Sequence, residues 1–116
     1  MLSLPSHANV YLCVQPIDLR KSFEGLCGIV ANVFQRNVLD GHLFLFINKR
    51  RDRIKAMWID RDGLAIFYKR LEKGRFEVPR DAQTQPQVML DGTALAMLLG
   101  GVPLATPRRP RYQRGS

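Results

Sequence analysis

Cysteine and histidine are scarce in this 116-residue sequence. Cys13 and Cys27 are its two cysteines, and their placement fits neither a disulfide framework nor a tetrahedral zinc site. Neither of the two histidines, His7 and His42, forms a known nucleophile motif with a serine or cysteine. We therefore expect two reduced thiols, as in a cytosolic protein, and no metal centre built on these residues.

Long apolar runs are also missing. No uninterrupted apolar stretch approaches the roughly 18 residues that a transmembrane helix requires. The first nine residues lack the basic start and long apolar centre of a secretory signal. Hydrophobic residues still make up 46% of the chain, enough for one core, and the length leaves little room for a second. We predict one cytoplasmic domain with no membrane partner.

Motifs for catalysis are not found either. Lys73-Gly74 lacks the spacing of a phosphate-binding loop. The turn at 60–63 begins like a calcium loop, but its twelfth position is Leu71, not Glu. Six aspartates are assigned to predicted caps and turns, whereas two-metal catalysis needs several carboxylates that converge; they are Asp18, Asp40, Asp60, Asp62, Asp81 and Asp91. We expect no enzyme activity, no metal and no cofactor, and an active site assembled only by the fold stays open.

Basic residues concentrate in the middle of the chain and at its end. Residues 1–48 carry three bases and three acids, whereas residues 49–80 carry eleven bases and five acids. Residues 81–106 carry two acids and no base, and residues 107–116 carry four arginines and no acid. Clustered cations favour polyanions because each neutralised phosphate releases counterions. The distribution favours a nucleic-acid partner, and a solvated face with ordinary ion pairs is the alternative.

The first third of the chain predicts one strand followed by one helix. Residues 10–14 are β-branched and aromatic, which indicates a strand. Asp18 stands where a helix N-cap is expected, and apolar residues then recur at steps of three and four over 19–34. Residues 36–41, which end in Asp-Gly, form the predicted turn after this helix.

The middle of the chain predicts three strands with short connections, over 43–47, 54–59 and 64–68. A polar loop separates the first two, and a tight turn at 60–63, with Gly63 free to take positive φ, separates the last two. Because short connections join antiparallel neighbours, we predict a β-meander. Residues 75–78 form a further predicted edge strand.

The last third predicts a polar loop over 80–87 and a short apolar helix over 94–99, with Thr93 as its N-cap and Gly100 as its stop. Residues 103–116 are rich in proline and arginine and are predicted to be disordered alone. The predicted organisation is an N-terminal extension (1–8), one α+β domain (9–102) and a flexible basic tail (103–116). The domain is an antiparallel β-meander of about four to five strands packed with two helices.

The basic residues of the middle segment fall into two clusters, one after the first of the three strands and one after the third. A meander places both clusters at the same end of the sheet, where two basic loops can straddle a phosphate backbone. Tyr68 could stack on a base, as could Trp58 and Phe76, although core packing is favoured for the last two because large rings are usually buried.

Arg20 and Lys21 lie at the N-terminus of the predicted helix, where the helix dipole disfavours cations. Either an anionic ligand or an ion pair to Asp18 or Glu24 would explain them. The candidate nucleic-acid-binding residues are therefore Arg20, Lys21, Lys49, Arg50, Arg51, Arg53, Lys55, Lys69, Arg70, Lys73 and Arg75.

Several segments resemble one known family. Residues 16–26, Pro-Ile-Asp-Leu-Arg-Lys-Ser-Phe-Glu-Gly-Leu, are similar to the Pro-x-Asp-(Met/Leu)-Arg-Lys opening of the small second-reading-frame protein (TnpB type) of the IS66 insertion sequences. Residues 41–55, Trp58, Gly63 and the stretch Tyr-Lys-Arg-Leu-Glu-Lys-Gly-Arg-Phe at 68–76 resemble the same protein. The resemblance runs from about residue 9 to 102. Ile59 stands where that family more often has Asp, and the tail is not part of the motif.

The resemblance implies an accessory protein that acts beside a separate, larger transposase and other proteins of the same element. One hypothesis is a nucleoid-associated DNA-binding module on double-stranded element ends, with affinity that falls steeply with salt. The second is an assembly protein whose basic end docks an acidic surface of the transposase. A third, a small nuclease, requires a divalent metal and an essential carboxylate. The oligomeric state is left open.

Overall fold

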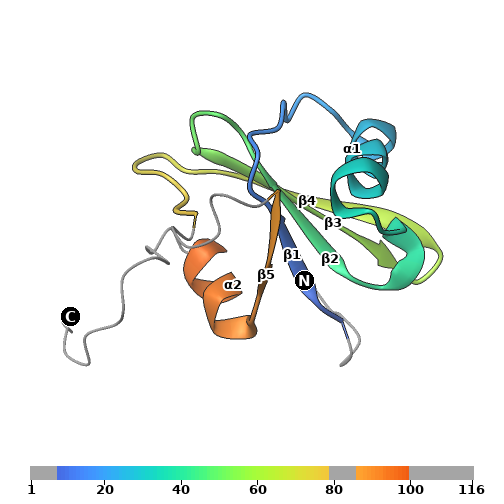
Figure 1. The fold of residues 1–116 in the computed structure, drawn as a ribbon. Coiled ribbons are helices and arrows are strands. Elements are labelled where there is room, and N and C mark those ends of the chain that lie inside the picture. Colours follow the sequence, from blue (N-terminus) through green and yellow to red (C-terminus); the bar gives the residue numbers. More distant parts are fainter. Residues whose placement is uncertain (1–7, 79–85, 100–116) are drawn as a thin grey trace.

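A computed structural model describes residues 8–78 and 86–99 of the chain (Figure 1). Five strands and two α-helices make up most of it, with a π-helical turn after the first helix and a 3₁₀ turn before the second strand. In chain order the elements are β1 (Val10–Cys13), α1 (Phe23–Ile29), η1 (Val30–Phe34), η2 (Val38–Asp40), β2 (Leu43–Ile47), β3 (Arg53–Asp60), β4 (Gly63–Arg70), β5 (Gln87–Leu90) and α2 (Gly92–Leu99).

The strands form one sheet in the order β4-β3-β2-β1-β5. The predicted meander is present as β2, β3 and β4, which pair antiparallel from Ile47 opposite Ile54 to Asp60 opposite Gly63. β1 runs parallel to β2, with Val10 opposite Leu43, and β5 pairs antiparallel with β1. The α+β class is therefore confirmed. The sheet is mixed because the helical segment carries the chain back to the end of the sheet where β1 started.

Two apolar cores cover the two faces of the sheet, and Figure 1 shows α1 and α2 on opposite sides of it. On the first face, Leu26 of α1 and Phe34 of η1 pack against Phe44, Phe46 and other side chains of the sheet. On the second face, the core gathers around residues of α2, β1, β2 and β3, including Leu98, Leu12, Leu45, Ile54 and Trp58. All five residues of β2 are buried, because this strand lies in the middle of the sheet with a core on each side.

The predicted long helix over 19–34 is shorter and begins later. Helix α1 starts after Ser22, which makes no side-chain cap, and the prediction of Asp18 as N-cap is wrong. Asp18 instead accepts hydrogen bonds from the backbone and guanidinium of Arg20 in the loop before the helix. Ile17 and Leu19 are buried although they lie in this loop. Their spacing therefore continues the apolar pattern of the helix, but the loop itself is not helical.

Three predictions near the C-terminal end of the described chain are corrected. Residues 75–78 form no strand, although Phe76 and Val78 are buried. The edge strand is β5 instead, and it begins at Gln87, where the sequence predicted the end of a loop. Asp91, not Thr93, caps α2, because its carboxylate accepts a 2.7 Å hydrogen bond from the backbone of Ala94. Gly100, most of the predicted extension, part of the predicted loop and the predicted tail lie outside the described residues.

The tight turn between β3 and β4 is present as predicted, with Asp60 opposite Gly63. The residue with positive φ in this turn is Arg61, at 58°, and not Gly63, which is already in the strand. This two-residue connection fixes the register of the hairpin over its whole length. It therefore determines which side chains of β3 and β4 meet at the far end, where the basic residues lie.

Candidate nucleic-acid interface

The two basic loops lie side by side at one end of the sheet. The register places Arg53 of β3 opposite Arg70 of β4. Two further backbone hydrogen bonds, Leu71 N to Asp52 O at 2.8 Å and Phe76 N to Arg51 O at 2.6 Å, join the β2–β3 loop to the segment after β4. Figure 1 shows this green loop beside the yellow segment. We call residues 48–53 and 69–77 the basic end; they hold eight bases and three acids.

Asn48 holds the β2–β3 loop in shape. Its side-chain oxygen accepts from the backbone amides of Asp52 and Arg53 at 3.1 and 3.0 Å, and its amide donates to the Asp52 carboxylate at 2.7 Å. This last bond, assisted by the nearby Arg50 and Arg53 charges, lowers the pKa of Asp52. Arg51 adopts a left-handed conformation with φ of 61°. The loop is thus closed on itself, with exposed Lys49 and Arg50 at its tip.

Arg53, Lys55 and Tyr68 lie together on the α1 face of the sheet. Arg53 Nη1 donates to the Tyr68 hydroxyl at 3.3 Å, and Lys55 Nζ lies 4.9 Å from the centre of the Tyr68 ring. Lys55 Nζ also donates to the backbone carbonyl of Lys21 at 2.8 Å, which links the sheet to the loop before α1. The Tyr68 side chain is thereby held near two cations.

Lys69 points the other way. Because side chains alternate along a strand, it lies on the α2 face, and its Nζ donates to the carbonyl of Leu99 at the end of α2, at 2.9 Å. Trp58 and Phe76 are buried in the core, as their favoured interpretation predicted. The structure therefore separates these three residues from the cationic surface, and Tyr68 is the aromatic residue left exposed there.

Arg20 pairs with Asp18, one of the two explanations that the sequence left open. The two side chains form a bidentate pair with a closest approach of 2.7 Å, and both are exposed, at 92% for Arg20 and 47% for Asp18. The hydrogen bonds from Arg20 lower the pKa of Asp18 to about 2. At such exposure the pair contributes little stability, although it offsets the Arg20 charge locally.

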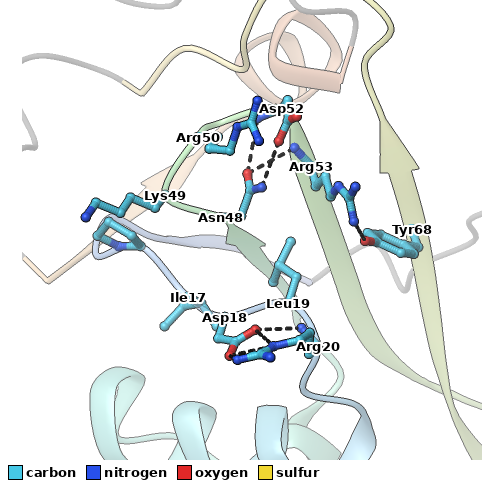
Figure 2. Close-up of a pocket in the computed structure, with 11 residues that line it drawn as sticks. Ile17, Asp18, Leu19, Arg20, Asn48, Lys49, Arg50, Asp52, Arg53 and Tyr68 are labelled. Atoms are coloured by element: carbon cyan, nitrogen blue, oxygen red, sulfur yellow. Dashed lines mark hydrogen bonds and ion pairs between the residues drawn. The ribbon is translucent and has the colours of Figure 1, made fainter.

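A cleft of about 820 Å³ joins these parts (Figure 2). One wall is the loop before α1, and the other is the β2–β3 loop, with Tyr68 on a third side. The lining residues are Pro16, Ile17, Asp18, Leu19, Arg20, Asn48, Lys49, Arg50, Asp52, Arg53 and Tyr68. Of the predicted site residues, the fold brings Arg20, Lys49, Arg50 and Arg53 to this cleft. The cleft is also lined by Asn48, Ile17 and Leu19, and no local pattern in the sequence indicated a site at these residues.

The described chain comprises residues 8–78 and 86–99. Within those ranges, no three His, Cys, Asp or Glu side chains lie close enough to hold a metal ion. Both cysteines are free, and burial raises the pKa of each thiol. No helix in the described part is long and apolar enough to cross a membrane.

The sequence matches a family model described as "IS66 Orf2 like protein" over residues 8–109. The chain belongs to the IS66 Orf2-like family. It is 33% identical to the uncharacterized protein y4hO of Sinorhizobium fredii (strain NBRC 101917 / NGR234), over 90% of this chain and 91% of that protein. It is 31% identical to the uncharacterized protein y4jC of the same organism, over 61% of each chain. No solved structure matches the chain.

Membership confirms the resemblance seen in the sequence and gives this IS66 Orf2-like protein an accessory role in transposition. The family is an accessory one and not the catalytic one of the element. The matched region contains the whole basic end and both walls of the cleft, whereas residues 110–116 of the tail lie beyond it. The candidate interface is therefore built from the part of the chain that defines the family.

Proposed function

We propose that this protein is a non-catalytic accessory factor of transposition that binds DNA through the basic end of its sheet. Its membership of the IS66 Orf2-like family supplies the context, since that family is an accessory one. The charge and geometry of the basic end support the DNA contact. The transposase and the other proteins of the element are the partners that this role implies.

The state of the basic side chains carries the proposal. Within the described residues, Lys49, Arg50, Lys73 and Arg75 make no side-chain hydrogen bond or ion pair, and all four are exposed. They come from two loops that backbone hydrogen bonds hold together. The backbone of these loops is held while the four positive charges are not neutralised, which suits them to phosphate contacts that position a protein on DNA.

Arg70 is a weaker contributor. Its Nη2 lies 3.4 Å from the Glu72 carboxylate, and both side chains are exposed. An exposed ion pair of this length is readily exchanged for a phosphate, because it contributes about 0–1 kcal/mol. Lys69 contributes least, since its ammonium group is engaged by the end of α2 on the other face.

The test is fluorescence anisotropy on a labelled element-end duplex across a salt series. Arg50→Gln and Arg75→Gln should each make the slope of log affinity against log salt concentration shallower, by about 0.9 for each phosphate contact removed. The matched control is Arg61→Gln, which removes the same charge from the opposite end of the hairpin, roughly 23 Å away at about 3.3 Å per residue. An equal loss in all three variants would contradict a local interface.

Absence of DNA binding at near-physiological salt would refute the proposal. Pull-down of the transposase, weakened by the same Arg50 and Arg75 substitutions, would then assign the basic end to protein docking. A divalent-metal-dependent cleavage of the duplex, lost on replacement of a carboxylate, would contradict the non-catalytic role.

A further inference from the structure

The cleft beside the basic end differs from a simple phosphate-binding surface because part of its lining is apolar. Pro16, Ile17 and Leu19 contribute to one wall, and Ile17 and Leu19 are otherwise buried in the core. A 2.9 Å hydrogen bond from Ile17 N to Ile47 O ties this wall to β2. Phosphates alone gain nothing from such a wall, whereas a flat aromatic ligand does.

Tyr68 supplies an aromatic surface in the same cleft. It is 49% exposed on β4, an edge strand of the sheet. Its hydroxyl accepts from Arg53 and its ring contacts the Lys55 ammonium, so the side chain is held in place although half of it meets solvent. Nucleic-acid bases stack on aromatic side chains held in this way, next to cations that follow the backbone.

The cations at the rim complete the arrangement. Lys49 and Arg50 lie on the β2–β3 loop and line the cleft without a hydrogen bond or ion pair to any described residue. Arg20 lines the opposite wall, but its guanidinium is committed to Asp18. The free positive charge is therefore on the side of the cleft formed by the basic end, as Figure 2 shows for Lys49 and Arg50.

We infer that this cleft binds an unpaired nucleotide of a DNA strand, with the base stacked on Tyr68 and the adjoining phosphates on Lys49 and Arg50. The inference rests on the proposed function and adds a substrate class, since bases inside a duplex are stacked on one another and present no free face. A volume of about 820 Å³ lies within the common range of ligand sites, roughly 300–1,000 Å³. The protein thus prefers DNA with a single-stranded end or gap.

The experiment compares four labelled DNAs by anisotropy at one salt concentration. They are a blunt duplex, the same duplex with a five-nucleotide overhang, the duplex with a five-nucleotide abasic overhang, and the single strand. The abasic overhang adds the same phosphates without bases, so it separates stacking from charge. We expect the normal overhang to bind roughly 5- to 150-fold more tightly than the abasic one, the range of one stacked base.

Three substitutions at two neighbouring residues make the test specific. Tyr68→Ala should abolish the preference for the normal overhang, and Tyr68→Phe should keep most of it because the ring remains. Phe67→Ala is the matched control: Phe67 is 42% exposed and next to Tyr68 in β4, but it lies on the opposite face of the sheet. Phe67→Ala should leave all four affinities unchanged.

The outcomes distinguish this inference from the proposed function. Equal binding of normal overhang, abasic overhang and blunt duplex, unchanged by Tyr68→Ala, would overturn the inference and leave the duplex-binding function standing. Binding of none of the four DNAs would overturn both. A preference for the normal overhang that survives Tyr68→Ala would also overturn the inference, because it would place the base elsewhere.

Discussion

Replacement of Asn48 tests whether the β2–β3 loop owes its shape to one side chain. Asn48→Ala removes three hydrogen bonds, two to backbone amides and one to the Asp52 carboxylate. Each net contribution is about 0.5–1.5 kcal/mol, and the Asp52 amide, whose hydrogen bond is partly buried, loses a partner that only water can replace. We therefore expect a loss of about 2 kcal/mol in the free energy of unfolding, or roughly 8–16 °C in Tm for a domain of this size.

Urea denaturation followed by tryptophan fluorescence measures this loss, since Trp58 is buried in the core. Asn48→Asp is the informative second variant, because it keeps a side-chain oxygen that accepts from the backbone amides of Asp52 and Arg53 but places a carboxylate against that of Asp52. Repulsion between the two carboxylates raises the pKa of one of them in the folded state. The resulting loss of stability is present at neutral pH and disappears as pH falls through that raised pKa. The difference in the free energy of unfolding between Asn48→Asp and the wild type should therefore shrink between pH 7 and pH 3.

The same substitution connects the loop to the proposed function. Asn48→Ala should weaken DNA binding several-fold without removing a charge, because Lys49 and Arg50 lose their fixed positions. Asn37→Ala removes one side-chain hydrogen bond, from the Leu39 amide, at η2, before the start of β2 and away from the basic end, and should leave DNA binding unchanged. A change of less than about 0.5 kcal/mol in the stability of Asn48→Ala would refute the role given to Asn48.

Three further predictions concern single contacts. Arg20→Gln should raise the pKa of Asp18 from about 2 toward its ordinary value near 3.8, as measured by NMR titration of the carboxyl group. In the wild type, any stability from this lowered pKa is present above the pKa of Asp18 in the unfolded chain and is lost as pH falls toward 2. Lys69→Met should destabilise the protein by about 1 kcal/mol in urea denaturation, through the end of α2, with DNA affinity reduced far less than by Arg50→Gln. Asp91→Ala should cost about 0.5–2 kcal/mol by the same measurement, whereas Thr93→Ala should cost less than 0.5 kcal/mol.

The sequence predicted best where structure is local. The strands β2, β3 and β4 follow one another with short connections, so periodicity and turn residues were enough to place them and to bring the two basic loops together. The parallel pairing of β1 with β2 was not predicted, because it depends on the path of the whole segment between Cys13 and Leu43. β5 was missed for the same reason, since its only described strand partner, β1, lies more than 70 residues earlier.

The candidate site was predicted in part. Arg50 and Arg53 could be assigned to one end of the sheet because they lie in a hairpin loop. The cleft could not be predicted, since Ile17 and Leu19 continue the apolar spacing of the helix that follows and meet the β2–β3 loop only in three dimensions. Lys69 was indistinguishable from Arg70 in the sequence, and only the alternation of β4 sends one to the end of α2 and the other to the α1 face.

DNA contact at the basic end is the central prediction, and an NMR titration of the labelled protein with an element-end duplex tests it most directly. We predict chemical-shift changes of the backbone amides concentrated in residues 48–53 and 70–76, with those of the turn at 60–63 unchanged. Changes centred on the turn at 60–63, or none at all at saturating DNA, would contradict the account.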